Sequence, residues 1–233
     1  FYFFFALDGL VGLKLALEEI PDLILSDVMM PKKDGFELCV FLKNDLRTSH
    51  IPLILLTAKS DYESKIRGLK RGADVYMGKP FDEDELKVQL KRLYEQQEKL
   101  KFYFKEKYPE LQAGLLAEEV KESVEIEDEF IQKIRAIVDL NYGSDSFNLN
   151  ELCVQLHMSR SQLFRKMKAL IQISPSQFIR NYRLEKAKIL LESGTLIVSE
   201  VAFDVGFKDA AHFSRLFSER FGVSPSKIKR YAK

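Results

Sequence analysis

Several residue types are scarce in this sequence, and each scarcity excludes a class of protein. The 233 residues include no tryptophan, two cysteines and three histidines. Because Cys39 and Cys153 lie far apart within apolar helical patterns, we expect buried thiols rather than a disulfide. The histidines lack the spacing of zinc ligands. No apolar run approaches the roughly 20 residues that cross a bilayer, so we expect no membrane span within this sequence.

A large net charge is also missing, but the charge that is present is unevenly distributed. The formal net charge is +1. Residues 1–100 carry 15 basic and 17 acidic side chains, residues 101–140 carry 6 and 10, and residues 141–233 carry 15 and 8. A basic C-terminal third behind an acidic connector predicts a unit that binds a polyanion.

The first hundred residues alternate between strand-like and helix-like stretches, which predicts βαβ units on a parallel sheet. The expected strands are residues 2–6, 23–27, 52–56 and 73–77, and the expected helices are 9–19, 35–44, 61–71 and a long one from 82 onward. Asp27, Thr57 and Lys79 follow successive strands, and the carboxyl ends of parallel strands are where such sheets bind ligands. For Asp27 alone, capping the next helix is an equally supported interpretation.

Three motifs carry a resemblance to a known family. SDVMMPKKDG around Asp27, ILLTAKS around Thr57 and ADVYMGKPF around Lys79 resemble, in order and spacing, the receiver domain of two-component response regulators. The resemblance implies a flavodoxin-like α/β fold in which Asp27 accepts a phosphoryl group from a phosphohistidine, Thr57 contacts the phosphate and Lys79 pairs with it. It also implies that Tyr76 is the switch aromatic. Phosphoryl transfer needs a positioned carboxylate with a cation and a hydrogen-bond donor in reach, which these residues supply.

The chain departs from the receiver pattern near its start. Receivers hold Mg²⁺ between the acceptor carboxylate, here Asp27, and an acidic pair that ends a first strand. That strand has no counterpart, because residues 2–6 match the second strand of the family, and Asp8 lies at the start of the following helix. We therefore expect a receiver truncated at its N-terminus, without its first strand and helix. Mg²⁺ is expected for the intact receiver but not for this fragment.

A duplication organises the C-terminal region. ISPSQFIR at 173–180 recurs as VSPSKIKR at 223–230, and the apolar stretch 152–158 recurs as 201–207. Each copy predicts a short helix, a tight turn and a second helix, which is the helix-turn-helix motif.

Between the copies, Ser174 and Pro175 are good starting residues for a helix that is expected to run to about Ser193, with Gly194 as its stop.

The second helix of each copy has one apolar face and one polar face on a helical wheel. Leu163, Met167 and Leu170 are expected inside in the first copy, and Phe213 and Phe217 in the second. The opposite faces centre on arginines, the side chains best suited to grip phosphate or read guanine. A solvated face is the alternative for one copy alone, and the matching arginines favour DNA. The expected DNA-binding residues are Arg160, Ser161, Phe164, Arg165, Lys168, Ala211, Ser214, Arg215 and Ser218.

Residues 129–233 resemble the AraC/XylS-type DNA-binding domain, above all in SEVAFDVGFKDAAHFSRLFSERFGVSPSKIKR. The resemblance implies two helix-turn-helix units, joined by a rigid helix, that enter successive major grooves about 34–36 Å apart. His157 departs from the pattern, since the second copy has Gly206 at that turn. If the turn needs a positive φ, histidine is strained there.

These patterns predict an α/β receiver at 1–100, an exposed acidic linker at 101–128 and an all-α double helix-turn-helix domain at 129–233. We expect a cytoplasmic, phosphorylation-responsive transcription regulator that binds double-stranded DNA, receives phosphate from a histidine kinase and forms a homodimer when active. A small-molecule substrate is not expected, and a metabolic enzyme is disfavoured because no glycine-rich nucleotide loop occurs.

Two alternatives stay open. The chain is the C-terminal portion of a hybrid sensor histidine kinase, whose full length includes an enzyme and an inner-membrane anchor, or it is a phosphorylation-independent regulator with a degenerate receiver.

Overall fold

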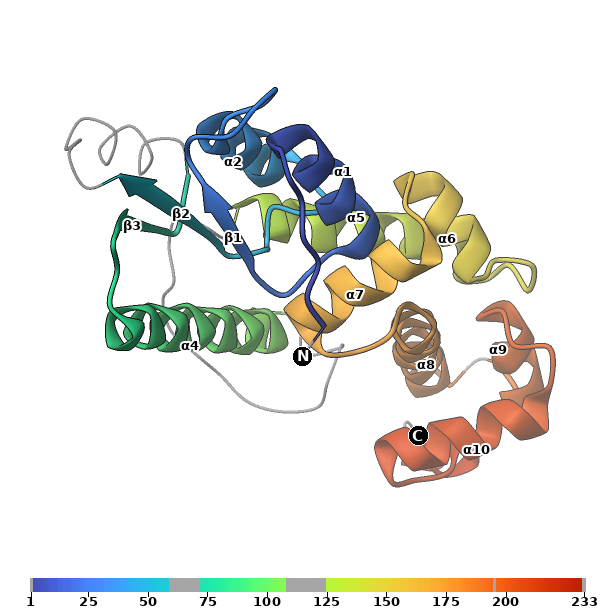
Figure 1. Cartoon of the computed structure of the whole chain (residues 1–233). Coiled ribbons are helices and arrows are strands. Elements are labelled where there is room, and N and C mark those ends of the chain that lie inside the picture. Colours follow the sequence, from blue (N-terminus) through green and yellow to red (C-terminus); the bar gives the residue numbers. More distant parts are fainter. Residues whose placement is uncertain (1, 59–71, 108–124, 195, 232–233) are drawn as a thin grey trace. The chain divides into compact units, whose positions relative to one another are not determined.

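The computed structural model describes residues 2–58, 72–107, 125–194 and 196–231 (Figure 1). The chain divides into two units. Within the described residues, the first unit takes its members from 1–104, 117–130 and 161–172, and the second from 105–116, 131–160 and 173–233.

A three-stranded parallel sheet forms the centre of the first unit (Figure 1). Its strands, in spatial order, are β1 (Ile24–Asp27), β2 (Leu53–Ala58) and β3 (Val75–Lys79). Asp27 lies opposite Leu56 in the register of β1 with β2, and Lys79 lies opposite Ala58 in the register of β2 with β3. Three of the four strands predicted from the sequence are thereby confirmed, with ends shifted by at most two residues.

Both faces of β2 are buried, because its side chains alternate between two helical layers. Leu53 and Leu55 pack in a cluster with α2 (Gly35–Asn44) and α1 (Gly9–Glu19), while Ile54 and Leu56 pack in a cluster with α4 (Glu83–Lys107). Strands covered on both faces read as continuous apolar runs rather than alternating ones. This is why the run from 52 to 56 was recognisable in the sequence.

The helices of the first unit begin at capping residues. Asp8 accepts hydrogen bonds from the amides of Leu10 and Val11 and starts α1. Asp34 starts α2 in a capping box with Glu37, which satisfies two backbone donors reciprocally. The cap of α2 is therefore Asp34 and not Asp27, so the capping interpretation of Asp27 is wrong.

Residues 2–6 do not form the strand predicted for them. They have no strand conformation, and Tyr2, Phe3 and Phe5 are 96%, 75% and 87% exposed. Strand backbone groups need a partner strand, and within the described residues β1 pairs with β2 alone. The helix predicted over 61–71 lies outside the described residues.

The acidic connector is also different from the prediction at its C-terminal end. Residues 125–129 belong to helix α5 (Glu125–Asn141), and Glu127 is 2% exposed. The acidic stretch is predicted to stay in water, but the Glu127 carboxylate forms an ion pair with Lys166 at 2.7 Å, which explains its burial.

The second unit is helical throughout its described residues. Besides the remainder of α5, its helices are α6 (Leu149–Leu156), α8 (Pro175–Glu192), α9 (Val198–Asp204), α10 (Ala210–Phe221) and α11 (Pro225–Tyr231). α8 confirms the prediction: Ser174 caps its start, Pro175 is its first residue and Gly194 follows its end at φ +74°. Helix α7 (Arg160–Ile171) follows α6 in the sequence, but all of it except Arg160 belongs to the first unit.

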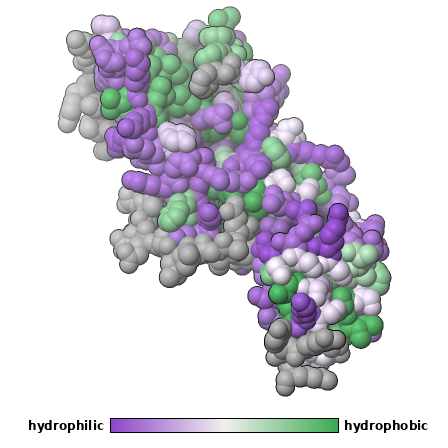
Figure 2. Space-filling view, turned by 90° about the horizontal axis from the view of Figure 1, so that it is seen from below, coloured by the Kyte–Doolittle hydropathy of each residue, from purple (hydrophilic) through white to green (hydrophobic). Residues whose placement is uncertain are grey.

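Cys39 and Cys153 are both buried thiols and not joined in a disulfide, as predicted. No helix among the described residues combines the length and the apolarity that crossing a membrane requires. On the face seen in Figure 2, hydrophilic side chains cover most of the described surface, with smaller hydrophobic areas between them.

Gly35 leads to the first prediction, because its backbone packs directly behind Asp27. A Cβ atom on Gly35 would lie 2.3 Å from the Asp27 carbonyl oxygen and 2.9 Å from the Val28 Cα. We expect Gly35→Ala to lower the free energy of unfolding by about 1–3 kcal/mol, the usual cost of overpacking, as measured by urea denaturation.

Gly12→Ala is the matched control. Its Cβ would meet Ala6 and Leu38 at ordinary contact distances of 3.6 and 3.7 Å inside α1. A helix-interior alanine is expected to stabilise by about 0.5–1 kcal/mol. Equal stability of the two variants would contradict the close packing at Gly35.

Candidate functional site

The carboxyl ends of the three strands bring together the residues that the first motifs predicted. Asp27 is the last residue of β1 and Lys79 the last residue of β3. The Lys79 ammonium donates a hydrogen bond to Asp27 Oδ2 and forms an ion pair with it. The contact spans the end of β2, the central strand, so all three strands must be in register for it to form.

The electrostatics of Asp27 favour its charged form. Burial raises the pKa of this carboxyl, but the hydrogen bond from Lys79 and the one from the Met29 amide at 3.2 Å outweigh burial and hold the pKa below its usual value. Both members of the pair keep part of their surface in water, with 38% of the Asp27 side chain and 42% of the Lys79 side chain exposed. The carboxylate is thus ionised and accessible, which a nucleophile requires.

Thr57 and Tyr76 lie on neighbouring strands beside this pair. Thr57 is 8% exposed, and its hydroxyl donates to the Ala58 carbonyl at 3.3 Å. The Tyr76 ring stacks on Phe36 with centroids 6.4 Å apart, and its buried hydroxyl has no hydrogen-bond partner among the described residues. Leaving a buried hydroxyl unpaired costs about 1–3 kcal/mol.

The described residues do not fit Mg²⁺. The receiver family typically depends on this ion, which prefers several oxygen ligands. Within the described part of the chain, no three His, Cys, Asp or Glu side chains gather closely enough to hold a metal. One oxygen of Asp27 is taken by Lys79, and Asp8 is taken by Lys32 at 2.6 Å and by the first turn of α1.

In the second copy, α10 has the two faces that the wheel predicted; we call α7 and α10 the reading helices. Phe213 and Phe217 are fully buried, and the cluster around them includes Val201 of α9, Val205 just after α9 and Leu184 of α8. Arg215 and Ala211 are exposed, and Ser214 and Ser218 are partly exposed. Arg215 has no hydrogen bond or ion pair with any residue that the structure describes.

The turn before α10 needs glycine. Gly206 has φ +83°, and a Cβ there would lie 2.3 Å from the Tyr142 carbonyl oxygen. His157, the equivalent residue of the first copy, has φ +53°. The positive φ considered in the sequence analysis is therefore present, and histidine adopts it at a cost that glycine does not have.

In the first copy, α7 also buries the predicted side chains. Leu163, Met167 and Leu170 are at most 1% exposed. The predicted DNA-binding residues lie on the exposed surface, as do their equivalents on α10, but three of them have partners. The contacts join Arg160 to Asn150 at 2.6 Å, Arg165 to Glu19 at 3.2 Å and Lys168 to the Gln172 carbonyl at 2.8 Å, while Ser161 and Phe164 are exposed beside them.

The sequence patterns did not predict three features near these sites: the Met29 amide, the close packing of Gly35 and the burial of Lys166. The Met29 amide is a backbone group, so no side-chain pattern announces it. Gly35 ends the SDVMMPKKDG motif, but its closeness to Asp27 is a tertiary contact. Lys166 is 0% exposed on α7, and a lysine on an amphipathic helix is expected in water.

A receiver-like sheet with a carboxylate–lysine pair at its edge, followed by helix-turn-helix elements, defines a class of signalling regulator. The sequence matches the family described as response regulator receiver domain over residues 4–91 and the one described as helix-turn-helix domain over residues 152–231. The chain therefore contains a response regulator receiver domain followed by a helix-turn-helix domain. This combination is typical of non-catalytic regulators.

Relatives share either most of the chain or one domain. Histidine kinase P4 from Formosa agariphila is 36% identical over 97% of this chain, which spans 16% of that protein. The DNA-binding dual master transcriptional regulator RpaA from Synechocystis is 46% identical over 38% of this chain and 36% of that protein. The solved C-terminal domain of the two-component response regulator yesN from Fusobacterium nucleatum is 28% identical, covering 43% of this chain and 98% of that one, with a TM-score of 0.41.

The lysine contact leads to a prediction about titration. Lys79→Met removes the donor that lowers the pKa of Asp27, so we expect that pKa to rise, as followed by the carboxyl carbon resonance in an NMR titration. In the wild type, the lowered pKa also means that ionised Asp27 stabilises the folded state at pH values above the pKa that this carboxyl has in the unfolded chain. This contribution is lost as the pH falls through the lowered pKa.

Lys87→Met serves as the control, because Lys87 pairs with Glu83 at 2.8 Å on the exposed face of α4. An unchanged Asp27 titration in Lys79→Met, or an equal shift in both variants, would show that the ion pair does not control this carboxyl.

Proposed function

We propose that the chain is a phosphorylation-responsive, sequence-specific transcription regulator of a two-component system, with Asp27 as phosphoacceptor. The observation that carries the proposal is the contact of Lys79 with Asp27 at the carboxyl edge of the sheet. Phosphoryl transfer is largely a matter of positioning and charge neutralisation, and this contact provides both for one carboxylate.

The residues of the site have distinct proposed roles. An Asp27 oxygen attacks the phosphorus of a phosphohistidine, the P–N bond breaks, and the imidazole leaves with its electron pair. Lys79 neutralises charge on the transferred group, and the Thr57 hydroxyl turns from the Ala58 carbonyl to a phosphate oxygen. The phosphate adds roughly two negative charges. The inward movement of Thr57 then lets Tyr76 move, and this change favours pairing of two receivers.

The output is proposed to be binding of double-stranded DNA by the reading helices. Arg165 and Arg215 centre their polar faces, flanked by the other predicted DNA-binding residues. A receiver at 1–100, a linker at 101–128 and a DNA-binding domain at 129–233 are the proposed boundaries, and both matched families fall within them. A homodimer would place two output domains on repeated sites, so affinity rises through effective concentration.

A second candidate has a specific observation in its favour. Because the similarity to Histidine kinase P4 extends over 97% of this chain, the same regulator is alternatively the C-terminal portion of a hybrid histidine kinase. The phosphodonor histidine would then belong to the same polypeptide rather than to a separate kinase. In either case, the described residues act on DNA in the cytoplasm.

The DNA proposal predicts the effect of one arginine. Arg215→Ala should weaken binding of a selected duplex about fivefold to 100-fold, the range for one good arginine contact of about 1–3 kcal/mol. Fluorescence anisotropy across a salt titration should also show a shallower salt dependence if the contact is to phosphate. The control is Lys133→Ala, which removes an exposed cation of α5; equal losses in both variants would point to bulk charge instead.

The receiver proposal predicts that phosphorylation of Asp27 depends on acidic partners that the described residues do not supply. We expect acetyl phosphate with Mg²⁺ not to phosphorylate this 233-residue chain, because Asp27 has no acidic partners in the described residues. In a version that carries the acidic pair, phosphorylation should appear, disappear in Asp27→Asn and raise DNA affinity. An acid-labile phosphate on the present chain that Asp27→Asn removes would contradict the first expectation, and unchanged DNA affinity would contradict the last.

A further inference from the structure

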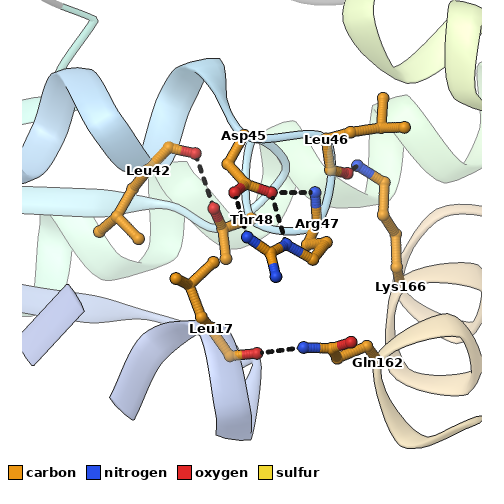
Figure 3. Close-up of polar contacts among 8 residues, drawn as sticks. All are labelled: Leu17, Leu42, Asp45, Leu46, Arg47, Thr48, Gln162 and Lys166. Atoms are coloured by element: carbon orange, nitrogen blue, oxygen red, sulfur yellow. Dashed lines mark hydrogen bonds and ion pairs between the residues drawn. The ribbon is translucent and has the colours of Figure 1, made fainter. Parts of the chain in front are cut away.

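Helix α7 lies against the receiver within the first unit (Figure 3). The Gln162 amide donates to the Leu17 carbonyl, the last-turn carbonyl of α1, at 2.7 Å. The Lys166 ammonium donates to the Leu46 carbonyl and, at 3.1 Å, to the Ser49 hydroxyl. These partners are 117 to 145 residues away in the sequence, so the contact is fully tertiary.

Lys166 is buried among polar partners that we call the socket, namely the Leu46 carbonyl, the Ser49 hydroxyl and the Glu127 carboxylate. The side chain is 0% exposed, and its third partner is the Glu127 carboxylate at 2.7 Å. The Leu46 carbonyl and the Ser49 hydroxyl accept two of the three donors of the ammonium group. The Glu127 carboxylate adds an ion pair, and the Phe130 ring centroid lies 4.7 Å from the nitrogen. A buried ammonium is tolerated only where it is paired and hydrogen-bonded, so this seat is specific for a cationic side chain.

The receiver side of the socket is held by hydrogen bonds that do not involve α7. Arg47 binds Asp45 through two hydrogen bonds, of 2.9 and 2.6 Å, and the buried Thr48 hydroxyl donates to the Leu42 carbonyl at 2.8 Å (Figure 3). These contacts fix the loop that presents the Leu46 carbonyl and the Ser49 hydroxyl. A loop held in this way loses little conformational entropy when α7 docks on it.

The docked face overlaps the reading face of α7. On a wheel, Gln162 and Lys166 lie on the flank beside Arg165, and Arg165 itself forms an ion pair with Glu19 of α1 at 3.2 Å. While it pairs with Glu19, this guanidinium is held at the receiver and has fewer donors left for DNA. Arg215, its equivalent on α10, has no such partner among the described residues.

We propose that the receiver carries a docking socket for the first reading helix, and that the docked chain is a closed state in which only the second reading helix is available to DNA. The inference rests on the proposed DNA-binding function. Docking and DNA binding by α7 compete, so whatever weakens the socket raises DNA affinity, and DNA in turn displaces α7 from the receiver. The socket uses the last turn of α1 and the loop at 45–49.

The first test compares two neighbouring glutamates in the full chain. Glu19→Gln removes the partner of Arg165, while Glu18→Gln makes the same change in charge at an exposed residue whose contact is Lys14 at 4.0 Å. With a mixed-sequence duplex that spans two successive major grooves, we expect Glu19→Gln to bind about two- to fivefold more tightly than Glu18→Gln, the range for one exposed ion pair. Equal affinities would overturn the role of Arg165.

A second pair of variants weakens the socket itself. Glu127→Gln leaves Lys166 without its carboxylate, and Glu129→Gln changes an exposed residue of the same helix by the same charge. We expect Glu127→Gln to raise affinity for the same duplex by about tenfold or more relative to Glu129→Gln, because an unpaired buried charge strongly disfavours docking.

Amine acylation read by mass spectrometry tests docking without relying on affinity. In the free chain, Lys166 should resist acylation while the exposed Lys168, on the same helix, reacts. Saturating duplex should reverse the pattern, with Lys166 reactive and Lys168 protected. Acylation of both lysines in the free chain would overturn the proposal.

The outcomes separate this inference from the function beneath it. If Arg215→Ala weakens binding but Glu19→Gln and Glu127→Gln behave as their controls, the regulator function stands and the closed state is wrong. If no variant, nor the unaltered chain, binds duplex DNA, the proposed function fails and the inference fails with it.

Discussion

The rest of the structure depends on one constraint, the burial of strand β2 on both faces. Because β2 is covered by α1 and α2 on one side and by α4 on the other, it fixes the register of β1 and β3 at its edges. That register places Asp27 and Lys79 at the same end of the sheet. A one-residue slip would turn every side chain of a strand to the opposite face, so the packing of the core also sets the geometry of the site.

Two lysine–carboxylate pairs in the first unit illustrate how solvent changes the role of the same chemistry. Lys79 and Asp27 are each about two-fifths exposed, so either side chain can exchange its partner at modest cost. Lys166 and Glu127 are at most 3% exposed, and separating them leaves a buried charge unless α7 moves as a whole. The Lys79–Asp27 pair can therefore exchange partners in water. The Lys166–Glu127 pair suits a contact that is either fully made or fully broken.

The two copies of the duplication differ in the turn residues that flank their second helices, α7 and α10. His157 and Gln172 flank α7 with φ +53° and +62°, where Gly206 and Gly222 flank α10. Non-glycine residues in this conformation carry strain of about 1–2 kcal/mol each. Gln162 and Lys166 also bind the receiver. The first copy therefore combines strained turns with contacts to the receiver.

Local patterns in the sequence determined the strands around Asp27, Thr57 and Lys79, the start and end of α8, and the inward faces of α7 and α10, because burial periodicity, turn residues and caps act over a few positions. They did not determine the fate of residues 2–6, which needed a partner strand, or that of Glu127. Only the tertiary structure decided that Lys166 is buried. Its stability there comes from a carbonyl, a hydroxyl and a carboxylate that lie far away in the sequence, and no local pattern records such distant partners.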